Sequence, residues 1–182
     1  GSFFIVFSIF LFLSIISYFF SGEIDQSTIY EFTDRKIKTK NLLSKSGAWV
    51  SHFLVFNGFG LSSIIFAWLV GLSGLNVLIK PNNKKIYKNW IWGTFVTIWL
   101  SILFGFFHSY PKLGGMIGFE INLFFQDYIG KTGLILLLLL SLIAYFSIRF
   151  GLTTQHIINF FNTKKLSKSS DDLSAVNESE LV

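Results

Sequence analysis

The sequence predicts an all-α membrane protein with four transmembrane helices, arranged as two hairpins, and an amphipathic interfacial helix before the last span. The first observation is composition: 52% of the residues are hydrophobic and only 14% are charged, whereas a soluble domain usually carries about 25% charged residues. The second is that polar segments separate four long apolar runs, each of about 18 residues or more, which is enough to cross a bilayer. The chain has no cysteine, which excludes disulfides and thiolate metal sites.

The first apolar run, Phe3–Phe20, is near the lower length limit for a spanning helix. It lacks the charged flank and the small-residue cleavage site of a signal peptide, so we interpret it as a retained helix that further residues precede in the full protein. Its Ser14, Ser17 and Ser21 share one small, polar face. We expect this face to pack against other helices.

The second run, Trp49–Ile79, is too long for one upright span. We expect it to enter as an interfacial segment over residues 47–53 and to become a tilted helix after Gly58. A stripe of small residues follows at helical spacing: Gly60, Ser63, Ala67, Gly71 and Gly74. Such a stripe lets helix backbones approach closely in lipid. The third and fourth runs are Trp90–Phe107 and Gly133–Phe150.

The segment between the third and fourth runs is amphipathic. Apolar side chains recur at a helical period over residues 117–128, with four polar residues between them: Glu120, Asn122, Gln126 and Asp127. The segment is too polar to span, so the pattern predicts a helix on the outer interface. We expect the four polar residues to form a face that binds partner proteins.

The orientation follows from the polar turn Lys80–Lys88, which carries four lysines and no acid. A lysine-only loop between apolar spans is typical of the cytoplasmic side. With an even number of spans, both termini are then cytoplasmic. We expect contact with anionic lipid at such basic segments, including the tail lysines Lys164, Lys165 and Lys168.

The sequence offers little catalytic chemistry. His52, His108 and His156 are too scattered for a linear metal motif, although His52 and His108 would both lie near the outer face. An interfacial, hydrogen-bonded role for them is the better interpretation, and we expect no metal and no cofactor. The spans contain no ionisable residue apart from Arg149 at one end, which disfavours a transporter or channel. No basic and aromatic array predicts direct nucleic-acid binding.

Three short segments, in order, resemble the membrane domain of the FtsK/SpoIIIE DNA translocases. Residues 17–27 suit the end of that domain's first helix. Gly47, Ala48 and Trp49, followed by Gly60, resemble the entry to its second helix. Gly114, Gly115 and Gly118 resemble its Gly-Gly-x-x-Gly loop before the last helix. With Gly71, these residues are the ones to which we assign family-motif and packing roles.

The resemblance implies a membrane anchor over residues 1–161 and a polar linker over residues 162–182 that leads to a cytoplasmic motor. The family forms a hexameric, ATP-driven motor at the division septum, so self-association and contacts with septal membrane proteins of the divisome are implied. This chain lacks the Walker motifs and the DNA-reading domain, so we expect an inner-membrane scaffold for chromosome segregation and no enzyme activity of its own. The alternative is a small polytopic subunit of another inner-membrane complex, in transport or secretion.

Overall fold

The computed structural model describes residues 1–27, 29, 34, 36, 38–79, 81 and 83–150. All regular structure in this described part is helical, and no strand occurs there. The surface helix predicted over residues 152–161 and the polar tail over residues 162–182 lie outside the described residues, as do Lys80 and Asn82 of the predicted turn. The all-α prediction is therefore confirmed for the part of the chain that the structure describes.

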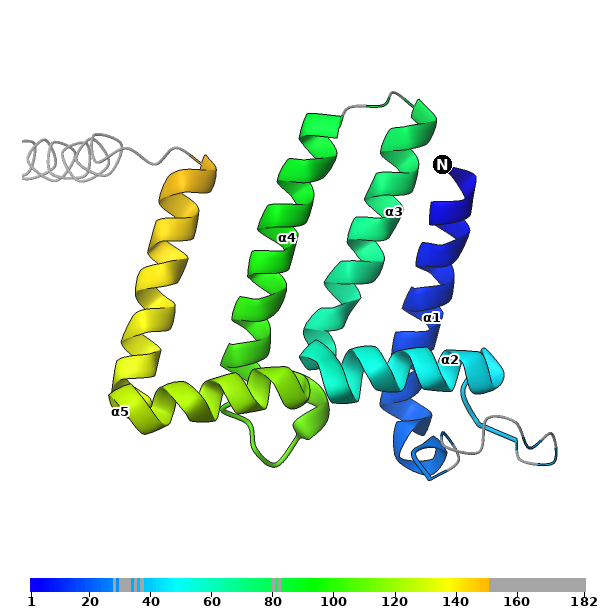
Figure 1. Ribbon diagram of the computed structural model, residues 1–182, viewed down its shortest axis with the longest axis horizontal. Helices are drawn as coiled ribbons and strands as arrows, with labels where there is room; N and C mark the ends of the chain where they lie inside the picture. Colours follow the sequence, from blue (N-terminus) through cyan, green and yellow to red (C-terminus); the bar gives the residue numbers. More distant parts are fainter. Residues whose placement is uncertain are drawn as a thin grey trace, which may run out of the picture. The chain divides into compact units, whose positions relative to one another are not determined.

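The chain divides into two compact units, Gly1–Leu134 and Ile135–Val182. The helices of the first unit are α1 (Ser2–Asp25), α2 (Ser44–Ser51), η2 (His52–Phe59), η3 (Gly60–Ser63), α3 (Ile64–Ile79), α4 (Asn83–Phe104) and the beginning of α5 (Pro111–Phe150), as Figure 1 shows. The described part of the second unit, residues 135–150, is the remainder of α5.

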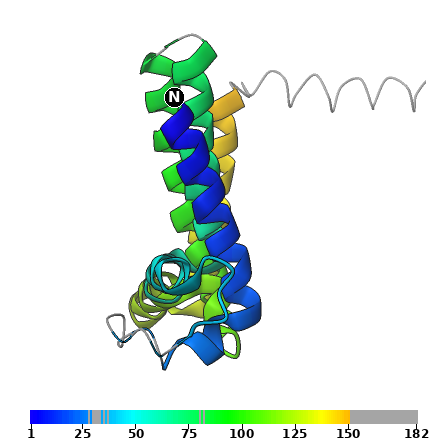
Figure 2. The same cartoon turned by 90° about the vertical axis from the view of Figure 1, so that its right-hand side faces the viewer.

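Within the first unit, α1, α3 and α4 run alongside one another, whereas α2 with η2, and the first part of α5, lie across them at one end (Figures 1 and 2). The direction changes at two glycines: Gly58 has non-helical angles (φ −96°, ψ −127°) and Gly60 has φ 65°. Glycine reaches such angles without the steric cost that a Cβ imposes. The prediction that residues 47–53 form a segment separate from the following span is confirmed.

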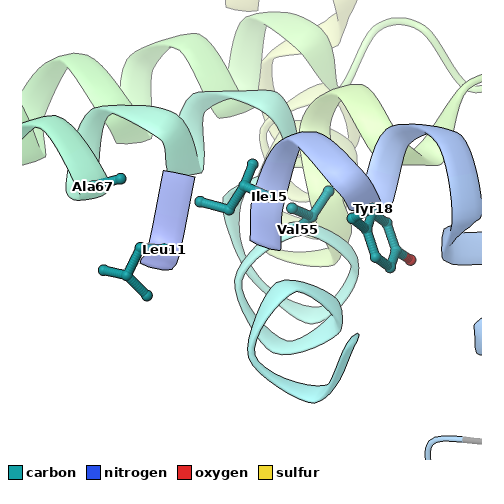
Figure 3. Close-up of a cluster of buried hydrophobic side chains, with 5 residues drawn as sticks. All are labelled: Leu11, Ile15, Tyr18, Val55 and Ala67. Atoms are coloured by element: carbon teal, nitrogen blue, oxygen red, sulfur yellow. The ribbon is translucent and has the colours of Figure 1, made fainter. Parts of the chain in front are cut away.

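The buried core of the first unit lies between α1, η2 and α3. Its side chains are Leu11, Ile15, Tyr18, Val55 and Ala67 (Figure 3). The predicted serine face of α1 is also buried, since Ser14, Ser17 and Ser21 are all buried. Ser17 Oγ accepts a hydrogen bond from the N–H of Leu42, so part of this face lies against the loop before α2.

Small residues of α3 lie against α1. Ser8 Oγ donates a hydrogen bond of 2.7 Å to the carbonyl oxygen of Ala67. A Cβ at Gly71 would lie 2.7 Å from Ser8 Oγ, and one at Gly74 would lie 2.9 Å from the backbone nitrogen of Ile5. Both are shorter than ordinary van der Waals contacts, so the absence of a side chain is what lets the two helices meet.

The predicted Lys80–Lys88 turn is wrong in extent, because α4 already begins at Asn83. Pro81 cannot donate a backbone hydrogen bond and so favours the end of a helix before it. Lysine is a good helix former, and Lys84, Lys85 and Lys88 lie in the first turns of α4. The helix ends at Phe104, three residues before the predicted end of the third run.

The amphipathic helix predicted over residues 117–128 is confirmed but is longer and part of α5. Two glycines with left-handed angles interrupt α5, Gly115 (φ 67°, ψ 174°) and Gly130 (φ 71°, ψ 167°). They separate residues 116–129 from the segment over residues 131–150. The last apolar helix therefore begins two residues before the predicted start at Gly133.

Three helical stretches of the described chain are long and apolar enough to cross a membrane: Ser2–Gly22, Ser44–Ile79 and Pro111–Phe150. Helix α4 is not among them, and the three lysines within its first six residues lower its hydropathy. The prediction of a helical membrane protein is confirmed, and the arrangement of four spans in two hairpins stays a prediction.

Candidate functional site

The loop before α2 is fastened to α1 by a buried carboxylate. Asp25, at the end of α1, is only 2% exposed. Its two carboxylate oxygens accept hydrogen bonds from the backbone N–H groups of Lys40 (2.6 Å) and Asn41 (2.8 Å). Such charge-assisted bonds offset part of the cost of removing a carboxylate from water. Ser17 Oγ adds an acceptor for the N–H of Leu42 at 3.0 Å.

Asn41 connects this loop to two helices. Its Nδ2 donates to the carbonyl oxygen of Ser14 (3.2 Å) and to Ser51 Oγ (3.4 Å), and its Oδ1 accepts from the N–H of Leu43 (3.0 Å). Gly47 lies against it, since a Cβ there would be 2.6 Å from Leu43 Cβ and would also meet Asn41 Oδ1. We call Asp25, Ser17, Asn41, Ser51 and Gly47 the loop clamp.

A second junction joins the break before α3 to the break in α5. A Cβ at Gly60 would lie 2.6 Å from the backbone nitrogen of Gly115, and a Cβ at Gly115 would lie 2.7 Å from the carbonyl oxygen of Val55. Each glycine also needs its positive φ. The two broken backbones are thus in direct contact, with no side chain between them.

Helix α4 completes this junction. A Cβ at Gly105 would lie 2.6 Å from the carbonyl oxygen of Gly118, and one at Gly114 would lie 2.9 Å from the nitrogen of Gly105. Ser101 Oγ donates a 2.6 Å hydrogen bond to the carbonyl oxygen of Gly114. We call this contact the glycine crossing, and its members are Gly60, Gly105, Gly114, Gly115, Gly118 and Ser101.

The residues with expected family-motif and packing roles are distributed over several contacts. Gly60, Gly114, Gly115 and Gly118 meet at the glycine crossing, whereas Gly47 belongs to the loop clamp and Gly71 lies against α1. Their neighbours Ala48 and Trp49 differ: Ala48 is buried and Trp49 is exposed.

The expected partner face is divided by the structure, which corrects the prediction of one polar face. Asn122 is 0% exposed and donates a 2.8 Å hydrogen bond to the carbonyl oxygen of Ile102. Gln126 donates to Asn122 Oδ1. Glu120 and Asp127 are exposed. The helical period of the apolar residues placed all four polar residues on one helix. It could not distinguish Asn122, whose amide is buried against the α4 backbone, from the exposed polar residues beside it.

The histidines lie in different surroundings. His52 is buried, with its ring 5.0 Å from that of Phe56, and its Nδ1 has no hydrogen-bond partner. His108 is exposed, and its Nδ1 lies 3.0 Å from the carbonyl oxygen of Phe106. Among the described residues, no group of three or more histidine, aspartate or glutamate side chains could hold a metal ion.

Sequence reasoning gave no role to Asp25 or Asn41, and it gave Ser101 only a general packing role on the third apolar run. The sequence signal for Asp25 was a carboxylate at the end of an apolar helix. The loop that follows has backbone N–H groups that need hydrogen-bond acceptors. Asn41 lies in the segment that leads into the Gly-Ala motif, yet an asparagine before a helix reads first as a turn residue. Ser101 is one of several hydroxyls on an apolar helix, and only the fold distinguishes it.

Transverse helices joined to membrane-length helices through glycine contacts define a polytopic membrane domain, with no catalytic constellation among its described residues. The chain matches the family described as the 4TM region of DNA translocase FtsK/SpoIIIE over residues 1–162, and it belongs to this family. It is therefore a multi-pass inner-membrane domain of the translocase type, and the matched region is the membrane region and not the motor. No curated protein and no solved structure matches it significantly.

The glycine crossing can be tested with two alanine substitutions that impose the same backbone strain. Gly130→Ala adds a Cβ at φ 71° and ψ 167° with nothing within 4 Å, and we expect it to cost about 1–3 kcal/mol of unfolding free energy. Gly115→Ala adds the same strain plus overlap with the backbone of Val55, which costs about 1–3 kcal/mol more. Melting temperatures in detergent measure the difference, and equal losses would contradict a close backbone contact at Gly115.

The loop clamp can be tested with Asn41→Leu. The substitution leaves buried backbone groups without hydrogen-bond partners, so we expect the free energy of unfolding to fall by about 1–3 kcal/mol. We also expect faster tryptic cleavage after the exposed Lys36, Lys38 and Lys40. Asn57→Leu is the matched control, because Asn57 is exposed. Unchanged cleavage in the Asn41 variant would show that the clamp does not hold the loop.

Proposed function

We propose that this chain is the membrane anchor and septal scaffold of a cell-division DNA translocase, and that it supports chromosome segregation by an attached hexameric motor. The observation that carries the proposal is the family match over residues 1–162. The glycine crossing supports the scaffold role, because it fixes two transverse helices to each other. A scaffold needs a surface whose parts keep their relative positions, and close backbone contact provides this.

The helix lengths support four spans. At about 1.5 Å per residue, the 21 residues Ser2–Gly22 and the 22 residues of α4 each extend about 32–33 Å. Gly60–Ile79, with one 3₁₀ turn, extends about 32 Å. Residues 131–150 extend about 30 Å. All four lengths fit a hydrocarbon core of about 30 Å, so we assign α4 as a span in spite of its lysines.

The charges support a cytoplasmic position for the α3–α4 connection. The segment Lys80–Lys88 carries four lysines in nine residues and no acid, whereas the loop over residues 21–46 carries five basic residues mixed with four acidic ones. With four spans, both termini then lie in the cytoplasm. The transverse helices lie on the opposite, outer side, where Glu120 and Asp127 are available to septal membrane proteins.

The orientation is tested by single cysteines in this cysteine-free chain. Ser27→Cys and Tyr110→Cys are expected to react with a membrane-impermeant thiol reagent added outside intact cells, and Lys84→Cys only after permeabilisation. All three native residues are exposed. Labelling of Lys84→Cys alone from outside would mean that the domain is inverted.

The scaffold role is tested by removing the two exposed acids. We expect the double variant Glu120→Gln, Asp127→Asn to fold and insert normally and to lose about 1–2 kcal/mol of partner binding, roughly tenfold. Septal localisation and co-purification of membrane partners measure this in the full translocase. Asp34→Asn removes an exposed acid from a different loop and serves as control. Unchanged localisation and co-purification in the double variant would overturn the proposed partner face.

A further inference from the structure

A groove between α3 and α4 combines apolar and basic side chains in a way that the anchor role does not use. It has a volume of about 390 Å³. The apolar part of its wall comes from α3 and from Pro81 after it, and the polar part comes from both helices: Leu72, Leu75, Ile79 and Pro81, with Asn76, Lys85 and Asn89. Helices α3 and α4 lie side by side (Figure 1).

The groove lies beside a tight contact of the same two helices. A Cβ at Gly93 would lie 2.6 Å from Leu69 Cδ1, and Trp90 Nε1 donates a 2.9 Å hydrogen bond to Ser73 Oγ. The lining residues on α3, from Leu72 to Ile79, follow that contact toward the lysine-bearing end of α4. The two helices are thus in close contact around Gly93 and Trp90, and the groove opens between them one to two turns nearer the lysine-bearing end of α4.

We propose that the α3–α4 groove binds one anionic phospholipid, with an acyl chain along Leu72 and Leu75 and the phosphate beside Lys85. The apolar part of the wall suits an acyl chain, and the basic, polar part suits a phosphate headgroup. Lys84 and Lys88 are exposed at this end of α4, and charged lysine side chains reach the headgroup region, so this end of α4 lies at the level of lipid phosphates. The leucines one and two turns away lie at the level of the acyl chains.

The charge pattern selects an anionic lipid over a zwitterionic one. Neither α3 nor α4 carries an acidic residue, so the two helices that line the groove bring only positive charge to it and offer no carboxylate to a choline-type cation. This inference requires α3 and α4 to lie in a membrane but does not depend on the orientation or on the septal role.

The test uses the whole chain in detergent, titrated with phosphatidylglycerol or with phosphatidylcholine of the same acyl chains. The readouts are the melting temperature, which rises when a ligand binds the folded state, and the lipid retained in native mass spectrometry. We expect phosphatidylglycerol to be preferred. Lys85→Gln should weaken its apparent affinity about five- to tenfold, the effect of losing one charged phosphate contact.

Lys84→Gln is the matched control, because it removes the same charge one residue away from an exposed position outside the groove wall. It should change the affinity less than about twofold if the groove is specific. Equal losses in both variants would indicate only general attraction to basic protein and would overturn the proposal. Equal binding of phosphatidylcholine would overturn it as well.

Two further experiments separate the contributions of the acyl chain and of the phosphate to lipid binding. Leu75→Trp places a large side chain in the groove without changing charge, and we expect it to abolish retention of phosphatidylglycerol while helicity stays unchanged. Retention at the native level would overturn the acyl-chain position. Inorganic phosphate at the same concentration should not raise the melting temperature. If it did so as strongly as the lipid, the groove would be a site for free anions and the proposal would be wrong.

Discussion

The structure of the first unit depends on the direct contact between two broken backbones, at Gly60 and at Gly115. Helices that run across the end of a membrane bundle must be joined to helices that run through it, and each joint interrupts a ladder of backbone hydrogen bonds. In lipid, an interrupted backbone is tolerated only where protein covers it. Here each joint covers the other, and both glycines carry the positive φ that the change of direction requires.

Hydroxyl and amide side chains form hydrogen bonds with many of the backbone groups that lose their helical partners at the joints. The N–H of Gly60 reaches the carbonyl oxygen of Val55, and Ser62 Oγ donates 2.6 Å to the carbonyl oxygen of Phe59. Ser101 does the same for Gly114, and Asn122 for Ile102. A buried backbone group without a partner costs about as much as a lost hydrogen bond. These small polar residues therefore belong to the folding of the domain as much as its leucines do.

The sequence predicted the elements better than their ends and better than the contacts between them. Apolar runs located the membrane-length helices, and Gly58 correctly marked where the transverse segment ends. The turn after Ile79 was predicted too long, because lysines were interpreted by their charge although lysine also favours the first turns of a helix. Contacts such as Gly60 with Gly115 join positions far apart in the chain, and no local pattern encodes which glycine meets which.

Asn122 illustrates why the candidate site was the least predictable part. In the sequence of a helix with exposed acids, an amide 20 residues from its partner Ile102 looks the same as its neighbours Glu120 and Asp127. Lipid-facing positions, by contrast, accept many apolar side chains, and residues such as Phe3, Leu140 and Ile148 are largely exposed in this chain. Bilayer contact places few demands on which apolar residue stands there. Close backbone contact leaves no room for a Cβ, and the glycines of the Gly-Gly-x-x-Gly segment, Gly114, Gly115 and Gly118, all stand at such contacts.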